Sequence, residues 1–365
     1  MRTPCIACAW FLLCALLSLS GGLLTAAASA RGETPRALQI YFIDVEGGQS
    51  TLIVTPERHS LLIDTGWAGA GSGFRPGDPH GARDANRIVS AARDAGITQI
   101  DYLLITHFHI DHDGSVAELS RLMPIRTFID HSAPSAEADR ASPGTQEAYE
   151  AYLGVRSAGA HLQPGAGERL PLQDVEAIVV SSAGATLKRP LGQAAAANAA
   201  CPDHATPPRD PYENPRSTGV VVRYGAFRFL DVGDLTGQPL FNLACPKNLI
   251  GSVDVYLVAH HGGADASVAE TFAAFKPRVA IMNNGLSKGG ARLTYQALHQ
   301  VPGLEDVWQL HASSDAGDAN FPSPYIANLD ESTAHWIKLV ASEDGAFRVF
   351  NQRTGEWKTY APQSW

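Results

Sequence analysis

The residues best suited to chemistry in this chain of 365 residues lie in one short segment, Thr-His-Phe-His-Ile-Asp-His at 106–112. His107, His109, Asp111 and His112 place three imidazoles and a carboxylate within six residues. These groups suit a divalent cation such as Zn²⁺. The segment follows an apolar stretch that predicts a buried strand, and side chains alternate along an extended chain, so His107 and His109 point to one side. The alternative, solvated loop histidines, fits this clustering poorly.

The pattern His-x-His-x-Asp-His after an apolar strand resembles the metallo-β-lactamase superfamily. Leu-Leu-Ile-Asp-Thr-Gly at 61–66 resembles the early strand of that family, whose aspartate (here Asp64) supports the site. Leu-Asp-Val-Gly-Asp-Leu at 230–235 resembles the later strand, whose aspartate (here Asp234) bridges two metal ions. Val-Ala-His-His-Gly-Gly at 258–263 resembles the segment of the last ligand. The resemblance spans roughly residues 38–312 and implies an α/β fold, the αββα sandwich, with the metal sites at one edge.

Within the superfamily, the chain is most similar to the subgroup that includes the extracellular nuclease-like domain of the DNA-uptake protein ComEC and phosphorylcholine esterases. The segments that carry this similarity are Phe-Ile-Asp-Val at 42–45 with Gly48 and Ser50, Asn214 with Ser217, and Lys-Pro-Arg-Val-Ala-Ile at 276–281. Two positions depart from the subgroup, because Glu46 stands where it has glycine and Gln49 where it has aspartate. These departures concern the substrate loop rather than the metal site.

The resemblance implies two divalent metal ions, with Zn²⁺ favoured and Mn²⁺ or Fe²⁺ compatible with the same ligands. The implied metal ligands are His107, His109, Asp111, His112, Asp234 and His261. The implied catalytic residues are Asp111, which is also the nearest proton acceptor, and His260, which polarises the leaving group or substrate. His260 and His261 are adjacent and would point apart in an extended segment, so we expect only one of them to be a direct ligand. The resemblance favours His261 for this role.

Three further residues have supporting roles in this interpretation. Asp64 would accept a hydrogen bond from a ligand imidazole and fix its tautomer, although an aspartate before Gly66 is equally typical of a turn. Asn214 would donate a hydrogen bond to a substrate oxygen, but asparagine before proline is also common in turns. The chain lacks the Gly-His-Thr-x-Gly-His segment that supplies another ligand in lactamase-like branches, which leaves His131 or His161 as substitutes.

Apolar periodicity predicts the elements that must position these residues. We expect strands at 38–45, 51–55, 60–64, 101–106, 175–181, 219–224, 227–231, 253–259 and 278–282, and helices at 84–95, 115–122, 267–275 and 294–300. The Ala- and Pro-rich region 184–216 is expected to be an insertion or long loop. Two Gly-containing turns divide residues 335–360 into three short strands, which predicts a small C-terminal β meander.

The first 30 residues have the apolar run and the Ala-Ser-Ala ending of a secretory signal peptide. We therefore expect a signal peptide at 1–30, a hydrolase domain at 31–333 and a β tail at 334–365. The mature protein would be periplasmic or extracellular, with no stable membrane span after cleavage. Cys201 and Cys245 would remain, as one disulfide or as two buried thiols.

Composition excludes disorder, since 45% of the residues are hydrophobic and 18% are charged. The formal net charge of −9 does not favour an extended nucleic-acid partner. Two basic pairs, Arg209 with Arg216 and Lys288 with Arg292, remain candidate phosphate contacts, although solvated surface charges are more common.

Three functions remain open at this point. The first is an exported di-metal hydrolase that uses a metal-activated hydroxide on phosphoester or phosphodiester bonds, with a small molecule or phosphoester as substrate. The second is an amide, lactone or thioester hydrolase on the same fold, including β-lactams. The third is a non-catalytic, metal-stabilised extracellular binding module. The sequence does not determine the oligomeric state.

Overall fold

The computed structural model describes residues 37–69, 81–142, 144–192, 196–201, 207–266 and 269–363. The predicted signal peptide at 1–30 lies outside these residues. Within the described part of the chain, no helix has the length and apolar character needed to cross a membrane.

The first sheet combines both ends of the described chain, in the order β18-β17-β16-β1-β2-β3-β4-β5-β6. Strands β16 to β3 in this order pair antiparallel, whereas β3 to β6 pair parallel. Its strands are β1 (Leu38–Phe42), β2 (Thr51–Val54), β3 (Ser60–Ile63), β4 (Ile100–Leu104), β5 (Ile125–Ile129), β6 (Ala160–Leu162), β16 (Ile337–Ala341), β17 (Phe347–Asn351) and β18 (Glu356–Tyr360). The C-terminal meander therefore extends the first sheet, through the pairing of β16 with β1.

The second sheet follows the order β15-β14-β13-β12-β11-β10-β8-β7, with β9 beside β8. Strands β11 to β15 pair parallel, and β10 pairs antiparallel with β11 and β8. Its strands are β7 (Arg169–Leu170), β8 (Glu176–Ser182), β9 (Ala185–Thr186), β10 (Gly219–Tyr224), β11 (Phe227–Asp231), β12 (Val255–Leu257), β13 (Val279–Met282), β14 (Asp306–His311) and β15 (Ile326–Asn328).

Alternation along the strands separates the apolar residues into three cores. In β1, Ile40 and Phe42 face the second sheet, whereas Tyr41 faces outward. In β11, Phe229 faces the first sheet and Leu230 faces outward. One core thus lies between the sheets, and each outer face packs against its own helices.

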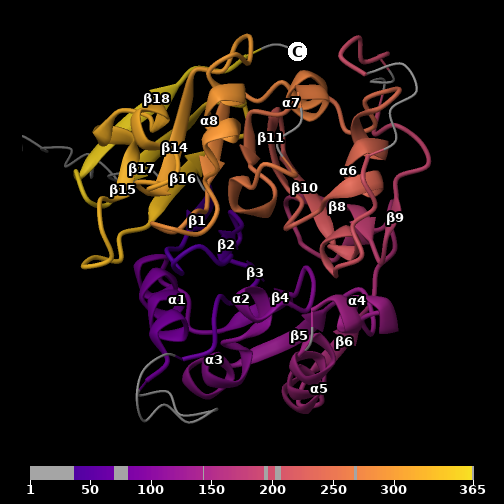
Figure 1. Ribbon diagram of the computed structural model, residues 1–365. Helices are drawn as coiled ribbons and strands as arrows, with labels where there is room; N and C mark the ends of the chain where they lie inside the picture. The colour runs from indigo at the N-terminus through magenta and orange to yellow at the C-terminus, as the bar shows by residue number, and fades with distance from the viewer. Residues whose placement is uncertain are drawn as a thin grey trace, which may run out of the picture. The chain divides into compact units, whose positions relative to one another are not determined.

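The helices cover the two outer faces (Figure 1). The first sheet packs against α1 (Arg83–Asp94), α3 (Val116–Leu122) and α5 (Thr145–Arg156), and the second against α6 (Gly237–Ala244), α7 (Ala269–Phe275) and α8 (Arg292–Leu298). The smaller helices are α2 (Ile110–Asp113), α4 (Ala136–Ala141), η1 (Asn214–Arg216), η2 (His260–Gly262), η3 (Gly317–Ala319) and η4 (Ser323–Tyr325). This confirms the predicted αββα sandwich.

The region 184–216, expected as an insertion or long loop, contains β9 and η1 among its described residues. Cys201 in this region forms a disulfide with Cys245, which follows α6. This pairing resolves the two alternatives that the sequence left open and fastens the region to the second sheet's helix layer.

Candidate metal centre

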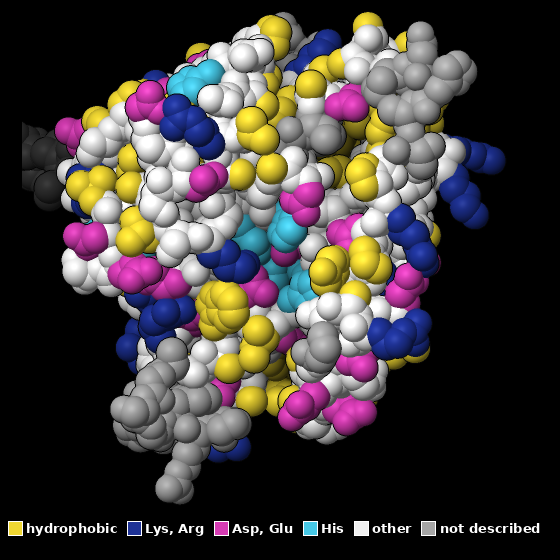
Figure 2. Space-filling model, viewed as in Figure 1, with side chains coloured by type: hydrophobic (Ala, Val, Ile, Leu, Met, Phe, Trp, Pro, Cys, Tyr) yellow, Lys and Arg dark blue, Asp and Glu magenta, His cyan; other side chains and the backbone are white. Residues whose placement is uncertain are grey.

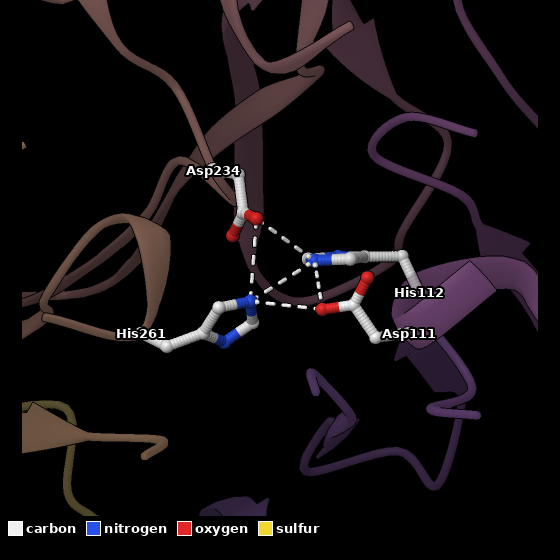
Figure 3. Close-up of side chains that lie close together, drawn as sticks. All are labelled: Asp111, His112, Asp234 and His261. Atoms are coloured by element: carbon white, nitrogen blue, oxygen red, sulfur yellow. Dashed lines mark hydrogen bonds and ion pairs between the residues drawn. The ribbon is translucent and has the colours of Figure 1, made fainter. Parts of the chain in front are cut away.

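Four side chains from both halves of the sandwich converge beyond the carboxyl ends of β4, β11 and β12. Asp111 and His112 belong to α2, whereas Asp234 follows β11 and His261 lies in η2. His112 Nε2 lies 3.1 Å from Asp234 Oδ2 and 3.3 Å from His261 Nε2. His261 Nε2 also lies 3.2 Å from one oxygen each of Asp111 and Asp234 (Figure 3). These four atoms surround one point, as the ligands of a single cation would.

A second group shares Asp234 with the first. His107 Nε2 lies 3.0 Å from His109 Nδ1 and 3.8 Å from Asp234 Oδ2. Among the described residues this group contains two imidazoles and one carboxylate. Because Asp234 belongs to both groups, its carboxylate is placed to bridge two cations. Among the described residues, the His107 group has one ligand residue fewer than the other.

The chemistry of these side chains fits cations. All except His109 are buried, and Asp234 Oδ1, His109 Nε2 and His261 Nδ1 have no hydrogen-bond partner. Burial raises the pKa of Asp234, but the imidazoles of His112 and His261 outweigh it and lower that pKa well below its usual range. Burial lowers the pKa of His107 well below its ordinary value, which leaves a neutral imidazole able to ligate. The centre thus combines ionised carboxylates with free imidazole nitrogens.

The surroundings of His112 show most clearly that the centre needs positive charge. Burial lowers its pKa, but Asp234, Asp111 and Asp64 surround the ring and raise that pKa well above the ordinary value. Three carboxylates around one imidazole require positive charge nearby. A divalent cation between Asp111, His112 and Asp234 would supply that charge.

Asp64 lies directly behind His112. Its Oδ2 is 2.6 Å from His112 Nδ1 and accepts a hydrogen bond from Thr106 Oγ1 at 2.7 Å, while its Oδ1 accepts from Thr106 N at 2.8 Å. These contacts fix the ring so that Nε2 faces Asp234, which is the arrangement that an imidazole-orienting carboxylate requires.

His260 lies beside the centre rather than within either ligand group. The expected extended conformation of this segment is wrong, because His260 and His261 both have left-handed backbone angles, with φ of 51° and 52°. His260 Nε2 lies 3.7 Å from Asp234 Oδ2 and 3.4 Å from Asn214 Nδ2, and its Nδ1 lies 2.8 Å from Asp265 Oδ1. Burial lowers the pKa of His260, but Asp234 and Asp265 raise it to about 8. Asp265 was not among the candidate residues of the sequence, because no motif marks it.

Lys288 also contacts the centre. Its ammonium group donates to Asp111 Oδ2 and, at 2.7 Å, to the Gly47 carbonyl oxygen. The following Gly289 has a φ of +69°, and a Cβ there would lie 2.4 Å from the His261 carbonyl oxygen. Only glycine fits this close approach, so the Lys288 loop packs directly on the His261 ligand.

The loop before β2 lies against the other side of Asp111. Gln49 N donates to the Asp111 carbonyl oxygen at 3.1 Å, and the Gln49 side chain donates to Asp231. Glu46 accepts from Arg87 at 2.9 Å. Glu46 and Gln49, the two residues that depart from the subgroup pattern, therefore attach this loop to the rest of the sandwich. Asp44, Glu46 and His311 also gather ligand-type atoms, but the Arg87 guanidinium occupies that cluster as its cation.

The remaining sequence candidates lie apart from the ligand groups. His131 Nε2 is 2.9 Å from a Glu213 carboxylate oxygen, and His161 Nε2 is 2.9 Å from Asp130 Oδ2. Neither histidine belongs to a ligand group among the described residues. Arg209 pairs with Glu137 at 2.6 Å, and Arg216 donates to the Ala133 carbonyl oxygen. Arg292 pairs with Asp318 at 2.5 Å, so of these basic residues only Lys288 contacts a ligand side chain.

A cavity of about 860 Å³ opens onto the centre. One wall carries His109, Asp111, Asp234 and His260. Figure 2 shows histidine side chains at the floor of a hollow on this face, with hydrophobic side chains along its margin. The volume falls in the range of small-molecule sites, about 300–1,000 Å³.

Comparison with known proteins agrees with this arrangement. Residues 43–181 match the family model described as the metallo-beta-lactamase superfamily. The match shows that this part of the chain is similar to the superfamily, whose members use two metal ions and are mostly hydrolases, with some oxygenases. His107, His109, Asp111 and His112 lie inside the matched range, and Asp234 and His261 lie beyond it.

Individual relatives are distant. An atrochrysone carboxyl ACP thioesterase from Aspergillus fumigatus is 32% identical over 77 residues, which cover 21% of this chain and 15% of the thioesterase. The metallo-beta-lactamase fold protein YhfI from Bacillus subtilis is 10% identical, with a TM-score of 0.43 and coverage of 75% of this chain and 96% of YhfI. CmlA, a diiron beta-hydroxylase from Streptomyces venezuelae, is 18% identical, with a TM-score of 0.40 and coverage of 69% of this chain and 46% of CmlA.

Proposed function

We propose that this chain is an exported hydrolase with two metal ions, Zn²⁺ in the first instance, that cleaves phosphoester or phosphodiester bonds. The observation that carries the proposal is the position of Asp234, whose Oδ2 lies within 3.8 Å of imidazole nitrogens from both ligand groups. A shared carboxylate suits two cations about 3.5–4 Å apart, the spacing that clamps the attacking and leaving oxygens of an in-line displacement. The similarity to the ComEC-like and phosphorylcholine-esterase subgroup points the same way.

The residues divide into those that bind cations and those that act around them. His107 and His109 would hold one ion, Asp111, His112 and His261 the other, and Asp234 both. When bound, two divalent cations lower the pKa of water toward about 7 and offset developing negative charge. Asp64 fixes the His112 ring, and Asp111 accepts a proton.

The two neighbours of the centre act on the substrate. His260, oriented by Asp265, donates a hydrogen bond toward the leaving group from Nε2. Lys288 offers an ammonium group beside Asp111, where a negatively charged substrate oxygen would be stabilised.

A second candidate is the hydrolysis of an acyl ester or thioester on the same scaffold. The 77-residue similarity to a thioesterase favours it, as do the apolar side chains of Tyr212, Leu240 and Phe241 that line the cavity. The same ligands serve both reactions, because each needs an activated water and stabilisation of a developing oxyanion.

Export is supported by the signal-like pattern of residues 1–30 and by the disulfide between Cys201 and Cys245, since disulfides persist in oxidising compartments. Secretion of the full-length chain, tested by fractionating cells that express it, checks this part of the proposal. Recovery of an unprocessed chain in the cytoplasm would contradict it.

The reaction is tested with purified protein loaded with Zn²⁺, Mn²⁺ or Fe²⁺, and four substrates: bis-p-nitrophenyl phosphate, p-nitrophenyl phosphorylcholine, p-nitrophenyl acetate and nitrocefin. Metal-dependent turnover of the phosphodiesters above the acyl substrates supports the first candidate. Turnover of p-nitrophenyl acetate or nitrocefin alone would replace the first candidate with the second, an acyl hydrolase. Bound metal without any turnover would favour the binding-module alternative.

A further inference from the structure

The cavity next to the metal centre has a second wall that no motif marks. It is formed by Pro207, Pro208, Pro211 and Tyr212 from one segment, by Leu240 and Phe241 of α6, and by Ala264. We call this surface the apolar wall. The apolar wall and the metal residues line the same cavity, so a substrate that fills the cavity would contact both.

The apolar wall is fastened in place in the structure. Thr236, which precedes α6, donates to Asp210 Oδ2 at 2.5 Å, and Tyr212 N donates to Asp210 Oδ1 at 2.7 Å. Three prolines restrict the backbone of the same segment. The segment continues into Asn214, which contacts His260. The wall is therefore pre-formed at a fixed place relative to the metal residues.

Tyr212 presents part of this apolar surface to solvent. Its side chain belongs to an apolar surface, yet the residue is 47% exposed. Exposed apolar patches beside a site that binds small molecules are typical of ligand contact. An apolar group against Tyr212 and Phe241 would remove this surface from water.

The charges around the cavity disfavour a polyanion. Besides the metal residues, the charged side chains of the lining, among the residues that the structure describes, are Arg209, Lys288, Asp210, Asp265 and Glu270. Both basic residues are already paired, Arg209 with Glu137 and Lys288 with Asp111. A groove for single-stranded nucleic acid needs a row of free Lys and Arg along the backbone. This cavity offers instead a few separate polar contacts, Lys288 and His260 among them, next to an apolar surface.

We propose that the substrate of this centre is a small ester with an apolar aryl or acyl substituent beside the scissile bond, and that Tyr212 and Phe241 determine this specificity. The inference rests on the proposed hydrolase function and deepens it. Burial of a benzyl in place of a methyl group is worth roughly 1.5–3 kcal/mol, which corresponds to a preference of about 10- to 150-fold.

The test uses substrate pairs with one leaving group. We compare kcat/KM for methyl and benzyl 4-nitrophenyl phosphate, for 4-nitrophenyl acetate and butanoate, and for a single-stranded DNA oligonucleotide. Wild-type protein should prefer the larger substituent by about tenfold or more. Tyr212→Ala and Phe241→Ala should lower kcat/KM for the larger substrates toward that of the smaller ones. Trp357→Ala, an exposed aromatic on β18 that does not line the cavity, is the matched control.

Binding provides a readout that does not depend on turnover. By calorimetry, benzylphosphonate should bind the metal-loaded protein about tenfold more tightly than methylphosphonate, and Tyr212→Ala should reduce this difference. Equal binding of the two phosphonates, equal kcat/KM within the pairs, or faster cleavage of the oligonucleotide would overturn the inference. If no substrate is cleaved but the phosphonate difference is present, the hydrolase proposal fails while the specificity of the cavity stands.

Discussion

The two walls of the cavity are built by different means. The metal centre behind one wall consists mostly of buried side chains, and four of its residues lie within one segment of the chain, residues 107–112. The apolar wall is partly exposed and combines the 207–212 segment with α6, without any chemical motif. Both parts therefore form only once distant segments have packed, but the metal ligands lie in recognisable motifs, whereas no motif marks the apolar wall. This difference separates the residues that decide whether reaction occurs from those that decide on which substrate.

The largest expected effect is at Asp234, the residue shared by both ligand groups. Asp234→Asn keeps the shape of the side chain but removes the shared negative charge. We expect a loss of at least one of the two metal ions and a fall in kcat of about 10³-fold, since each cation contributes several kcal/mol. Metal analysis and kinetics on the same sample measure both effects. Full activity with two ions bound would show that the carboxylate does not bridge.

Asp64 should have a smaller effect, because it acts only through His112. Asp64→Asn leaves the ligand atoms in place but removes the carboxylate behind the ring, so metal affinity should fall about 10- to 100-fold. Competition with a chelator measures this affinity. Excess metal should restore most of the activity, and failure of that rescue would contradict a purely orienting role.

Asp234 and Asp64 could both be named as candidates from the sequence, because their segments are short and carry recognisable residue types. The resemblance also predicted the sandwich, whose central strands are continuous apolar runs. The wider centre could not be predicted to the same extent. Lys288 was a candidate phosphate contact, but it meets Asp111 across 177 residues, and Asp265 contacts His260 only because η2 turns sharply. Such contacts depend on the packing of loops, which periodicity does not encode.

A substitution of Lys288 should distinguish cleavage of a phosphodiester from cleavage of an acyl ester. Lys288→Met removes a charged donor worth about 1.5–3 kcal/mol, so kcat/KM for an anionic phosphodiester should fall about tenfold or more. The neutral 4-nitrophenyl acetate should be affected less. The matched control is Lys338→Met, which removes a lysine on β16 that pairs with Asp94 of α1. An equal fall for both substrates would contradict a contact with anionic substrate oxygen.

Asp130 should affect stability without affecting chemistry. It follows β5 and accepts from Arg156, at 2.8 Å, and from Tyr152, at 3.0 Å. Burial raises its pKa, but the hydrogen bond from Arg156 outweighs this, and the pKa lies below its ordinary value. Asp130→Asn should therefore lower the free energy of unfolding by about 1–3 kcal/mol at pH 7.

The sign of the pH dependence follows from that depressed pKa. The stabilisation by Asp130 is present above the unfolded-state pKa of about 3.9 and is lost as the pH falls through the lower folded-state value. The difference in stability between wild type and Asp130→Asn, measured by denaturant unfolding, should thus begin to shrink as the pH falls below about 4. The exposed Asp318→Asn should show no such difference. A kcat changed by Asp130→Asn would place this residue in the reaction after all.

The central claim is that two cations bind through Asp234 and drive hydrolysis. The most direct measurement is metal content and phosphodiester turnover on one purified sample of wild type, His109→Ala and Asp234→Ala. The account predicts about two ions per wild-type chain, fewer in both variants, and turnover that falls with them. A folded wild-type protein that binds no metal after incubation with Zn²⁺, Mn²⁺ or Fe²⁺, or variants that keep both ions and full turnover, would contradict it.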